Sequence, residues 1–123
     1  MTVNDHETPI EVLKEALRKF RDERDWGQFH KPKDLATALS IEAGELQEKF
    51  LWKSDAQIVE YLQNPEKKEG VIEELMDVFN YALCLANVLD VDVASASLRK
   101  LEKNAKKYPV EKAKGSAKKY NEL

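Results

Sequence analysis

The chain has 123 residues, of which 42% are hydrophobic and 35% charged, and its formal net charge is −3. This length favours one domain, and a charge so near neutral gives no electrostatic argument for nucleic acid as the main partner. A single cysteine, Cys84, excludes an intrachain disulfide, and we interpret it as an inert core residue. No stretch approaches the roughly 18 apolar residues of a membrane span, and the polar N-terminus lacks signal-peptide features, so we expect a cytoplasmic protein.

The hydrophobic spacing is helical almost throughout, and the expected elements follow in chain order. The first helix is predicted to start at Thr8, with Pro9 in its first position and Glu11 completing a capping box. A loop over residues 26–31 separates this helix from a second long helix, which is expected from about residue 32 to residue 52.

A short helix and a third long helix come next. A second capping box, from Ser54 to Gln57, opens the short helix. Asn64 then caps the third long helix, which is expected over residues 65–89. Apolar residues lie on nearly all sides of this helix, so we expect it to be central and buried.

The last long helix is capped by Asp90 or Asp92, and Pro109 follows its end. Residues 111–123 carry lysines and few apolar residues, and we interpret them as a basic, mobile tail after a domain over residues 1–110. Short connections make consecutive long helices antiparallel neighbours. The sequence therefore predicts an all-α four-helix bundle with antiparallel long helices and a short extra helix between the second and the third.

Four carboxylates occupy positions where a helical core should be apolar. They form two pairs with the same i, i+3 spacing, so each pair lies on one helix face: Glu42 with Glu45, and Glu74 with Asp77. Ionised carboxylates that are buried without partners cost about several kcal/mol each, so we expect a cation to neutralise them. Oxygen ligands suit Mg²⁺, Mn²⁺ or Ca²⁺ rather than zinc, and phosphate chains are the usual substrates of Mg²⁺ sites. For any single pair, a solvated charged face is the alternative.

Aromatic and polar side chains supply further candidates for binding. Tyr81 follows Asp77 by one turn, and it is interpreted either as core packing or as a stacking platform for a nucleobase. The polar face of the last long helix is interpreted either as a solvated surface or as a phosphate-binding site. The residues concerned there are Lys100, Asn104, Lys107 and Tyr108.

The spacing Glu42-x-x-Glu45 followed by Glu74-x-x-Asp77 resembles the all-α nucleoside triphosphate pyrophosphohydrolases, the MazG-like superfamily. Segments 24–32, 45–52, 100–104 and 107–110 resemble its dCTP pyrophosphatase branch, and the similarity extends from residue 10 to residue 112. The resemblance implies that the four carboxylates bind Mg²⁺, with Mn²⁺ as the alternative ion. It also implies cleavage of a nucleoside triphosphate, with dCTP as the expected substrate, between the α and β phosphates to a monophosphate and pyrophosphate.

The same resemblance implies roles for the other candidates. Trp26, Trp52 and Tyr81 are expected to line the base and sugar pocket, while Lys100 and Asn104 are expected to hold phosphates. His30 matches the motif of the branch without an assigned contact, and Lys107 with Tyr108 matches the end of its last helix. The resemblance also implies a homodimer or homotetramer.

The general base is less defined by the sequence. Many members of the superfamily carry a carboxylate at position 41, where this chain has Ile41. We therefore expect Glu45 to orient the attacking water and Glu48, one turn further along, to assist from an outer position.

Two other classes of function remain open at this point. Within the enzymes, the alternative is a broader house-cleaning activity on several triphosphates, including dUTP. Outside the enzymes, the chain could be a helical interaction module whose acidic cluster holds structural cations, or, with weaker support from the basic tail alone, a nucleic-acid binder.

Overall fold

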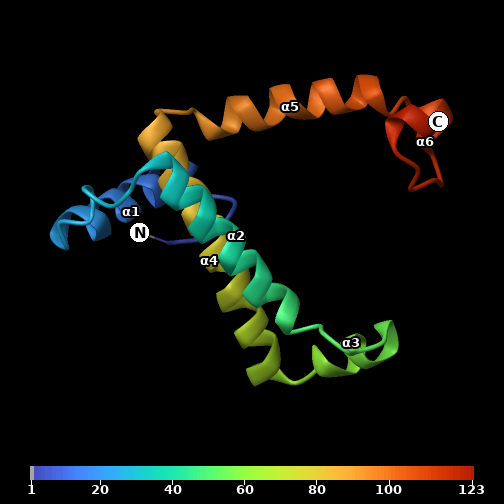
Figure 1. The fold of residues 1–123 in the computed structure, drawn as a ribbon, viewed down its shortest axis with the longest axis horizontal. Helices are drawn as coiled ribbons and strands as arrows, with labels where there is room; N and C mark the ends of the chain where they lie inside the picture. Colours follow the sequence, from blue (N-terminus) through green and yellow to red (C-terminus); the bar gives the residue numbers. More distant parts are fainter. Residues whose placement is uncertain (1) are drawn as a thin grey trace. The chain divides into compact units, whose positions relative to one another are not determined.

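The computed structural model describes residues 2–123, so Met1, the first residue of the predicted domain, lies outside the described part. Every regular element in residues 2–123 is helical (Figure 1). The elements are α1 (Ile10–Glu23), α2 (Pro32–Glu48), α3 (Asp55–Tyr61), α4 (Pro65–Leu89), α5 (Val93–Lys107), α6 (Val110–Ala113) and the 3₁₀ turn η1 (Tyr120–Glu122). The all-α class is confirmed, and the four long helices and the short extra helix of the predicted bundle are all present.

The chain divides into two compact units. The first ends at Asp90 and contains α1 to α4, and the second runs from Val91 to Leu123 and contains α5, α6 and η1. Helix α6 and η1 give regular structure to part of the segment predicted as a tail. The mobility of residues 111–123 stays a prediction.

Side-chain caps fix the starts of three helices as the sequence predicted. The Ser54 hydroxyl accepts a hydrogen bond from the Gln57 N–H at 3.2 Å, and the Gln57 side chain accepts one from the Ser54 N–H at 2.8 Å, which completes the capping box of α3. The Asn64 side chain caps α4, and the Asp92 side chain caps α5. Asp90 instead ends α4 in a left-handed conformation with φ of 54°. Such caps supply acceptors to N–H groups that have no partner within the helix.

Two predicted helix ends are wrong. No side chain caps α1, because the Thr8 hydroxyl accepts its hydrogen bond from the Asn4 N–H at 3.1 Å, and Pro9 is the capping residue rather than the first helical one. Helix α2 ends at Glu48, one turn before the predicted end at Trp52. Trp52 has φ of 64°, a left-handed conformation that an α-helix cannot contain.

The core of the first unit lies between α4 and its two neighbours. Helices α2 and α4 are the most extensively packed pair and run side by side in opposite directions (Figure 1). Leu35 of α2 and Leu83 of α4 are each only 2% exposed. On the α1 side, Arg18 donates to the Asn87 side-chain oxygen at 2.8 Å, and the Asn87 amide donates to the Lys14 carbonyl oxygen at 3.1 Å.

The prediction that α4 is buried on nearly all sides is wrong for the single chain. Leu75, Met76 and Phe79 are 46%, 40% and 38% exposed. Within its unit α4 packs mainly against α2 and α1, which leaves one apolar stripe of the helix uncovered. Among the described residues no single helix is long and apolar enough to cross a membrane, and α4 and α5 meet that test only as a bent pair.

Candidate active site

Three of the four predicted carboxylates meet at the contact between α2 and α4. Glu42, Glu45 and Glu74 each offer one oxygen, and these oxygens lie within 4.8 Å of one another. The i, i+3 spacing places Glu42 and Glu45 on one face of α2, and the packing of α2 against α4 brings Glu74 to that face. We call these three residues the carboxylate cluster.

The carboxylate cluster concentrates negative charge that other side chains do not neutralise completely. One side-chain oxygen of Glu42 and one of Glu74 are buried and have no hydrogen-bond partner. The neighbouring Glu42 carboxyl raises the pKa of Glu45, and burial followed by the charge of Glu45 raises the pKa of Glu74. Closely spaced acids with unpartnered oxygens are the donor set of a hard divalent cation, so the residues present fit such an ion.

Lys49 is a charged neighbour of the cluster that the sequence reasoning did not single out. Its positive charge lowers the pKa of Glu74, against the effects that raise it. Its Nζ lies 3.6 Å from the point where a β-carbon on Gly70 of α4 would be. The signal in the sequence was its position four residues after Glu45, which places both side chains on one face of a helix.

Asp77, the fourth predicted metal ligand, does not join the carboxylate cluster. It lines a cavity of about 490 Å³ between α1 and α4 together with Tyr81. Its charge still contributes to the raised pKa of Glu74, one turn away on α4. The structure therefore places Asp77 beside the cluster and on the wall of the adjoining cavity, and its role as a ligand stays a prediction.

This cavity brings together three predicted substrate-binding residues, and we call it the aromatic cavity. Trp26, His30 and Tyr81 all line it, and Phe20 meets Trp26 edge-on with ring centroids 5.7 Å apart. The same three residues also line an adjoining cavity of about 290 Å³ beside Leu35. A volume of a few hundred Å³ with aromatic walls and a few polar groups is typical of small-molecule sites.

The pKa values of two polar groups in the aromatic cavity, His30 and Tyr81, are shifted by burial. Burial lowers the pKa of His30, with the charge of Arg21 acting in the same direction, so the imidazole is neutral near pH 7. Burial raises the pKa of Tyr81, which keeps its hydroxyl as a hydrogen-bond donor. Asn80 also lines the cavity, and the sequence reasoning missed it although it follows Asp77 by three residues. Its amide can both donate and accept, which suits recognition of a base edge.

Cys84 lies on the wall of the aromatic cavity and is half-buried. Burial raises the pKa of its thiol, which disfavours the reactive thiolate. The inertness of Cys84 stays a prediction, and its place on a cavity wall was not expected.

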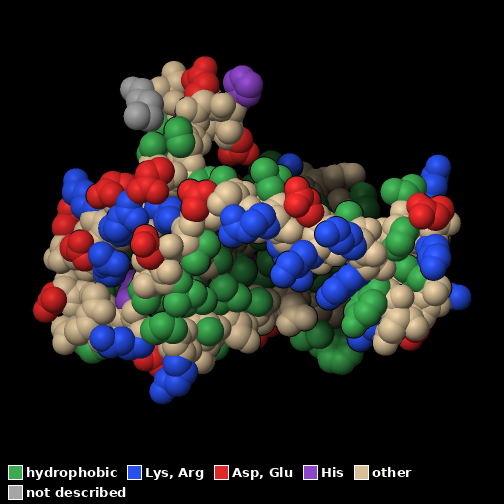
Figure 2. All heavy atoms as spheres, turned by 90° about the horizontal axis from the view of Figure 1, so that it is seen from above, with side chains coloured by type: hydrophobic (Ala, Val, Ile, Leu, Met, Phe, Trp, Pro, Cys, Tyr) green, Lys and Arg blue, Asp and Glu red, His purple; other side chains and the backbone are tan. Residues whose placement is uncertain are grey.

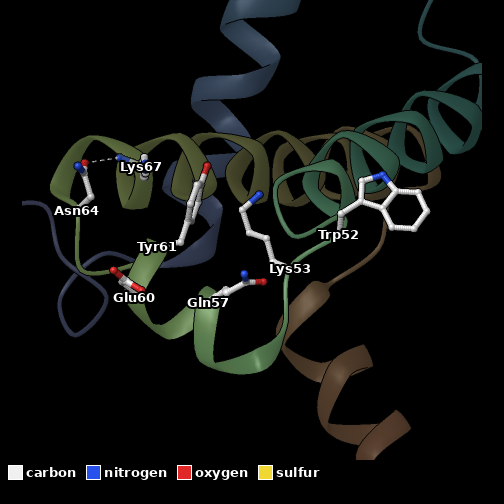
Figure 3. A pocket seen from close by; sticks show the side chains of 7 residues that line it. All are labelled: Trp52, Lys53, Gln57, Glu60, Tyr61, Asn64 and Lys67. Atoms are coloured by element: carbon white, nitrogen blue, oxygen red, sulfur yellow. Dashed lines mark hydrogen bonds between the residues drawn. The ribbon is translucent and has the colours of Figure 1, made fainter.

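Trp52 does not join Trp26 and Tyr81 within the chain. It lines a separate pocket of about 430 Å³ next to α3, where the Lys53 and Lys67 ammonium groups lie 4.8 and 5.2 Å from the Tyr61 ring centroid. Figure 3 shows the Trp52 indole pointing away from Tyr61, and the residue is 91% exposed. Its role in base binding stays a prediction.

The remaining candidates divide between α2 and the second unit. Glu48 is the exposed last residue of α2, and its charge contributes to the raised pKa of Glu45. In the second unit Lys100 and Asn104 lie on α5, where Figure 2 shows Lys and Arg side chains gathered. Phosphate binding by α5 stays a prediction.

The end of α5 is packed within its own unit. The Tyr108 ring meets Tyr120 edge-on at 6.2 Å, and the Lys107 ammonium lies 4.9 Å from the Tyr120 ring centroid. The proposed substrate contacts of Lys107 and Tyr108 likewise stay predictions.

Comparisons with known proteins identify the family of this chain. The sequence pattern of the MazG-like family matches residues 37–123, which contain the whole carboxylate cluster. The dCTP pyrophosphatase 1 of Rattus norvegicus is 41% identical over 117 residues and that of Homo sapiens 39%, with 95% of this chain and 69% of each relative covered. A solved structure of a pyrophosphatase from Archaeoglobus fulgidus shares 41% identity with a TM-score of 0.77, and the match covers 88% of this chain and 99% of that one. The chain belongs to the MazG-like family, and it is a hydrolase of the pyrophosphatase class.

Proposed function

We propose that the protein hydrolyses a nucleoside triphosphate, with dCTP preferred, between the α and β phosphates in a Mg²⁺-dependent reaction. The observation that carries this proposal is the carboxylate cluster, in which Glu42 and Glu74 have buried oxygens without hydrogen-bond partners. The aromatic cavity adjoins it through Asp77, so a place for a base and a place for a metal-bound phosphate lie next to each other. The names of the mammalian relatives support dCTP as the substrate.

We assign different roles to the carboxylates in and near the cluster. Glu42, Glu45 and Glu74 would hold the cation, with Asp77 as a further ligand from the same face of α4. A bound Mg²⁺ polarises phosphate oxygens and lowers the pKa of a bound water. Glu45 is exposed at the edge of the cluster, so it is the carboxylate that we assign to orienting the attacking water. Glu48, which lies one turn further on, would assist from the outside.

The aromatic cavity would bind the nucleoside. The ring faces of Trp26 and Tyr81 can stack with a base, since base–aromatic stacking contributes about 1–3 kcal/mol per base. The Asn80 side-chain oxygen can accept from the amino group of a pyrimidine, and its NH₂ group can donate to a ring carbonyl. Neutral His30 adds one donor and one acceptor without adding charge.

We also propose that the protein is a homodimer or homotetramer. Ile72, Leu75, Met76 and Phe79 recur at i, i+3, i+4 and i+7 on α4, and each is at least 38% exposed. Such a stripe is typical of a helix surface that packs against another helix. Light scattering on the wild type and on Leu75→Lys would test it, and a wild-type mass of one chain, 14.1 kDa, would contradict it. The cytoplasmic location also stays a prediction.

The test of the activity is a panel of dNTPs and NTPs incubated with Mg²⁺, with and without EDTA, and with products separated by ion exchange. EDTA-sensitive release of a monophosphate together with pyrophosphate is expected, fastest for dCTP. Similar rates on many triphosphates would favour the broader house-cleaning activity. Absence of turnover on the whole panel would contradict the proposal and favour an interaction module with structural cations.

A further inference from the structure

We propose that Lys49 binds the terminal phosphates of the substrate and, after cleavage, the pyrophosphate product. This inference rests on the proposed function, because it assigns a residue to the leaving-group end of the same site. Lys49 follows the last turn of α2 and is half-buried. The family resemblance assigns no role to Lys49.

The order of groups along α4 is the first argument. Tyr81 lines the aromatic cavity, Glu74 belongs to the carboxylate cluster, and Gly70 lies beside the Lys49 ammonium. At a helical rise of about 1.5 Å per residue, Tyr81 lies roughly 10 Å from Glu74 toward the C-terminal end of α4, and Gly70 lies roughly 6 Å from it toward the N-terminal end. The three features therefore lie in sequence along one helix.

Helix α2 gives the same order independently. Leu35 and Ala38 line the smaller cavity that shares Trp26 and Tyr81 with the aromatic cavity. Glu42 and Glu45 follow, and Lys49 comes one turn after Glu45. Because α2 and α4 are antiparallel, both helices place the aromatic cavity, the cluster and Lys49 in one spatial order (Figure 1).

A nucleoside triphosphate has its own fixed order of base, sugar, α, β and γ phosphate. With the base in the aromatic cavity and the α–β bond at the carboxylate cluster, the β and γ phosphates extend away from the base. The Lys49 ammonium lies on that side, beside Gly70. The Lys53 and Lys67 ammonium groups lie instead near the Tyr61 ring. Lysine binds phosphate as a compact point charge with three donors, and such charge-assisted hydrogen bonds are stronger than neutral ones.

Gly70 leaves room for the Lys49 side chain beside α4. The absence of a side chain at Gly70 lets Nζ approach α4, at 3.6 Å from the position of a β-carbon there. Gly70 and Glu74 are four residues apart on α4, so the ammonium lies on the helix face that carries the cluster. The effect of its charge on Glu74 agrees with this placement.

The experiment compares binding of two products in the presence of Mg²⁺, inorganic pyrophosphate and dCMP, by isothermal titration calorimetry. Lys49→Met is expected to weaken pyrophosphate binding about tenfold or more, because it removes a charge-assisted contact, and to leave dCMP binding unchanged. Lys49→Arg is expected to retain most of the pyrophosphate affinity. Lys68→Met is the matched control, since Lys68 is exposed on α4 and lies about 200° around the helix from Gly70.

The outcomes separate this inference from the proposed function. Turnover by the wild type with equal pyrophosphate affinity in Lys49→Met would overturn the inference alone. An equal loss of dCMP and pyrophosphate binding would also overturn it, because a lysine that only offsets the carboxylate charge acts on both ligands through the metal. Absence of turnover in the wild type would overturn both. Circular dichroism checks folding of each variant, and Lys49→Gln provides a second neutral side chain if Lys49→Met does not fold.

Discussion

Helix α4 meets its two neighbours in opposite ways. Against α1, the Asn87 side chain accepts from Arg18 and donates to the Lys14 carbonyl, so the polar groups at that contact are paired. Against α2, Glu42 and Glu74 leave buried oxygens without hydrogen-bond partners. The polar groups of the α1 contact are paired within the chain, whereas the α2 contact leaves carboxylate oxygens that suit a cation.

The two contacts differ in how their polar groups are satisfied, whereas the apolar packing of α2 against α4 still forms much of the core. A buried polar group without a partner costs about 1–3 kcal/mol, and more when it is charged. Paired groups avoid that cost, so the α1 contact adds to stability whether or not a ligand is present. At the α2 contact we expect the unpartnered oxygens to lower the stability of the metal-free protein and a bound cation to restore it, which is typical of sites that are arranged for function.

The largest expected effect is on kcat/KM and follows from a substitution in the carboxylate cluster at the α2 contact. Glu74→Gln removes one ligand of the cluster, and we expect kcat/KM to fall at least about 1000-fold because the metal and the phosphate lose their position. Glu73→Gln, an exposed neighbour on the same helix, is the control and should retain wild-type kinetics. Steady-state pyrophosphate release measures both, and an active Glu74→Gln would remove the cluster from the mechanism. Asp77→Asn, assayed in parallel, is expected to abolish turnover while the helices stay intact.

The second prediction concerns a substitution that removes the hydrogen bonds between α4 and α1. Asn87→Ala leaves the Lys14 carbonyl and Arg18 without that partner, and we expect a loss of about 1–3 kcal/mol in the free energy of unfolding. Urea denaturation measures this loss. The KM for the triphosphate should not change at a temperature where the variant is folded, and a changed KM would show that the two contacts are coupled.

The two tryptophans extend the comparison to the binding of the base. We expect Trp26→Ala to raise KM about tenfold through the loss of stacking. Trp52→Ala is also expected to raise KM more than it lowers kcat, although Trp52 lies outside the aromatic cavity of its own chain. An unaltered KM in Trp52→Ala would leave that residue without a role in substrate binding.

The smallest expected effect is the dependence of stability on pH in EDTA. The pKa values of Glu45 and Glu74 are raised in the folded state, so folding takes up protons between pH 4.5 and the raised values. Stability from this source is present at low pH and is lost as the pH rises through the folded pKa. Melting temperatures of the wild type should therefore fall relative to Glu74→Gln as the pH rises, and saturating Mg²⁺ should remove this trend. A constant difference across pH would contradict the raised pKa values of these two carboxyl groups.

The sequence predicted those parts of the molecule that depend on neighbouring residues. The caps at Ser54, Asn64 and Asp92 are local hydrogen bonds, and the pairing of Glu42 with Glu45 follows from helical spacing alone. The meeting of Glu74 with that pair required one further assumption, that consecutive long helices are antiparallel, and this was correct.

The failures arose where several segments decide the outcome. The Thr8 hydroxyl accepts from the Asn4 N–H, which precedes it, and no side chain caps α1. Helix α2 ends before Trp52, which is left-handed although it is not a glycine, so nothing in the sequence indicated this conformation. The apolar pattern of α4 did not predict its exposed stripe. Such a pattern is the same whether a helix surface is covered by the same chain or left uncovered. Lys49 escaped notice because a lysine four residues after a glutamate also fits an ordinary surface pair.

The backbone of Trp52 has a consequence for how this position responds to selection. A bulky residue at φ of 64° costs of the order of 1 kcal/mol relative to glycine, which adopts that conformation freely. Selection for thermal stability alone would therefore replace Trp52 by glycine or asparagine, whereas the proposed role in base binding predicts that selection for turnover retains the indole. Libraries randomised at residue 52 and sorted separately for each property would then diverge, so this single turn can show whether an exposed side chain is retained for folding or for catalysis.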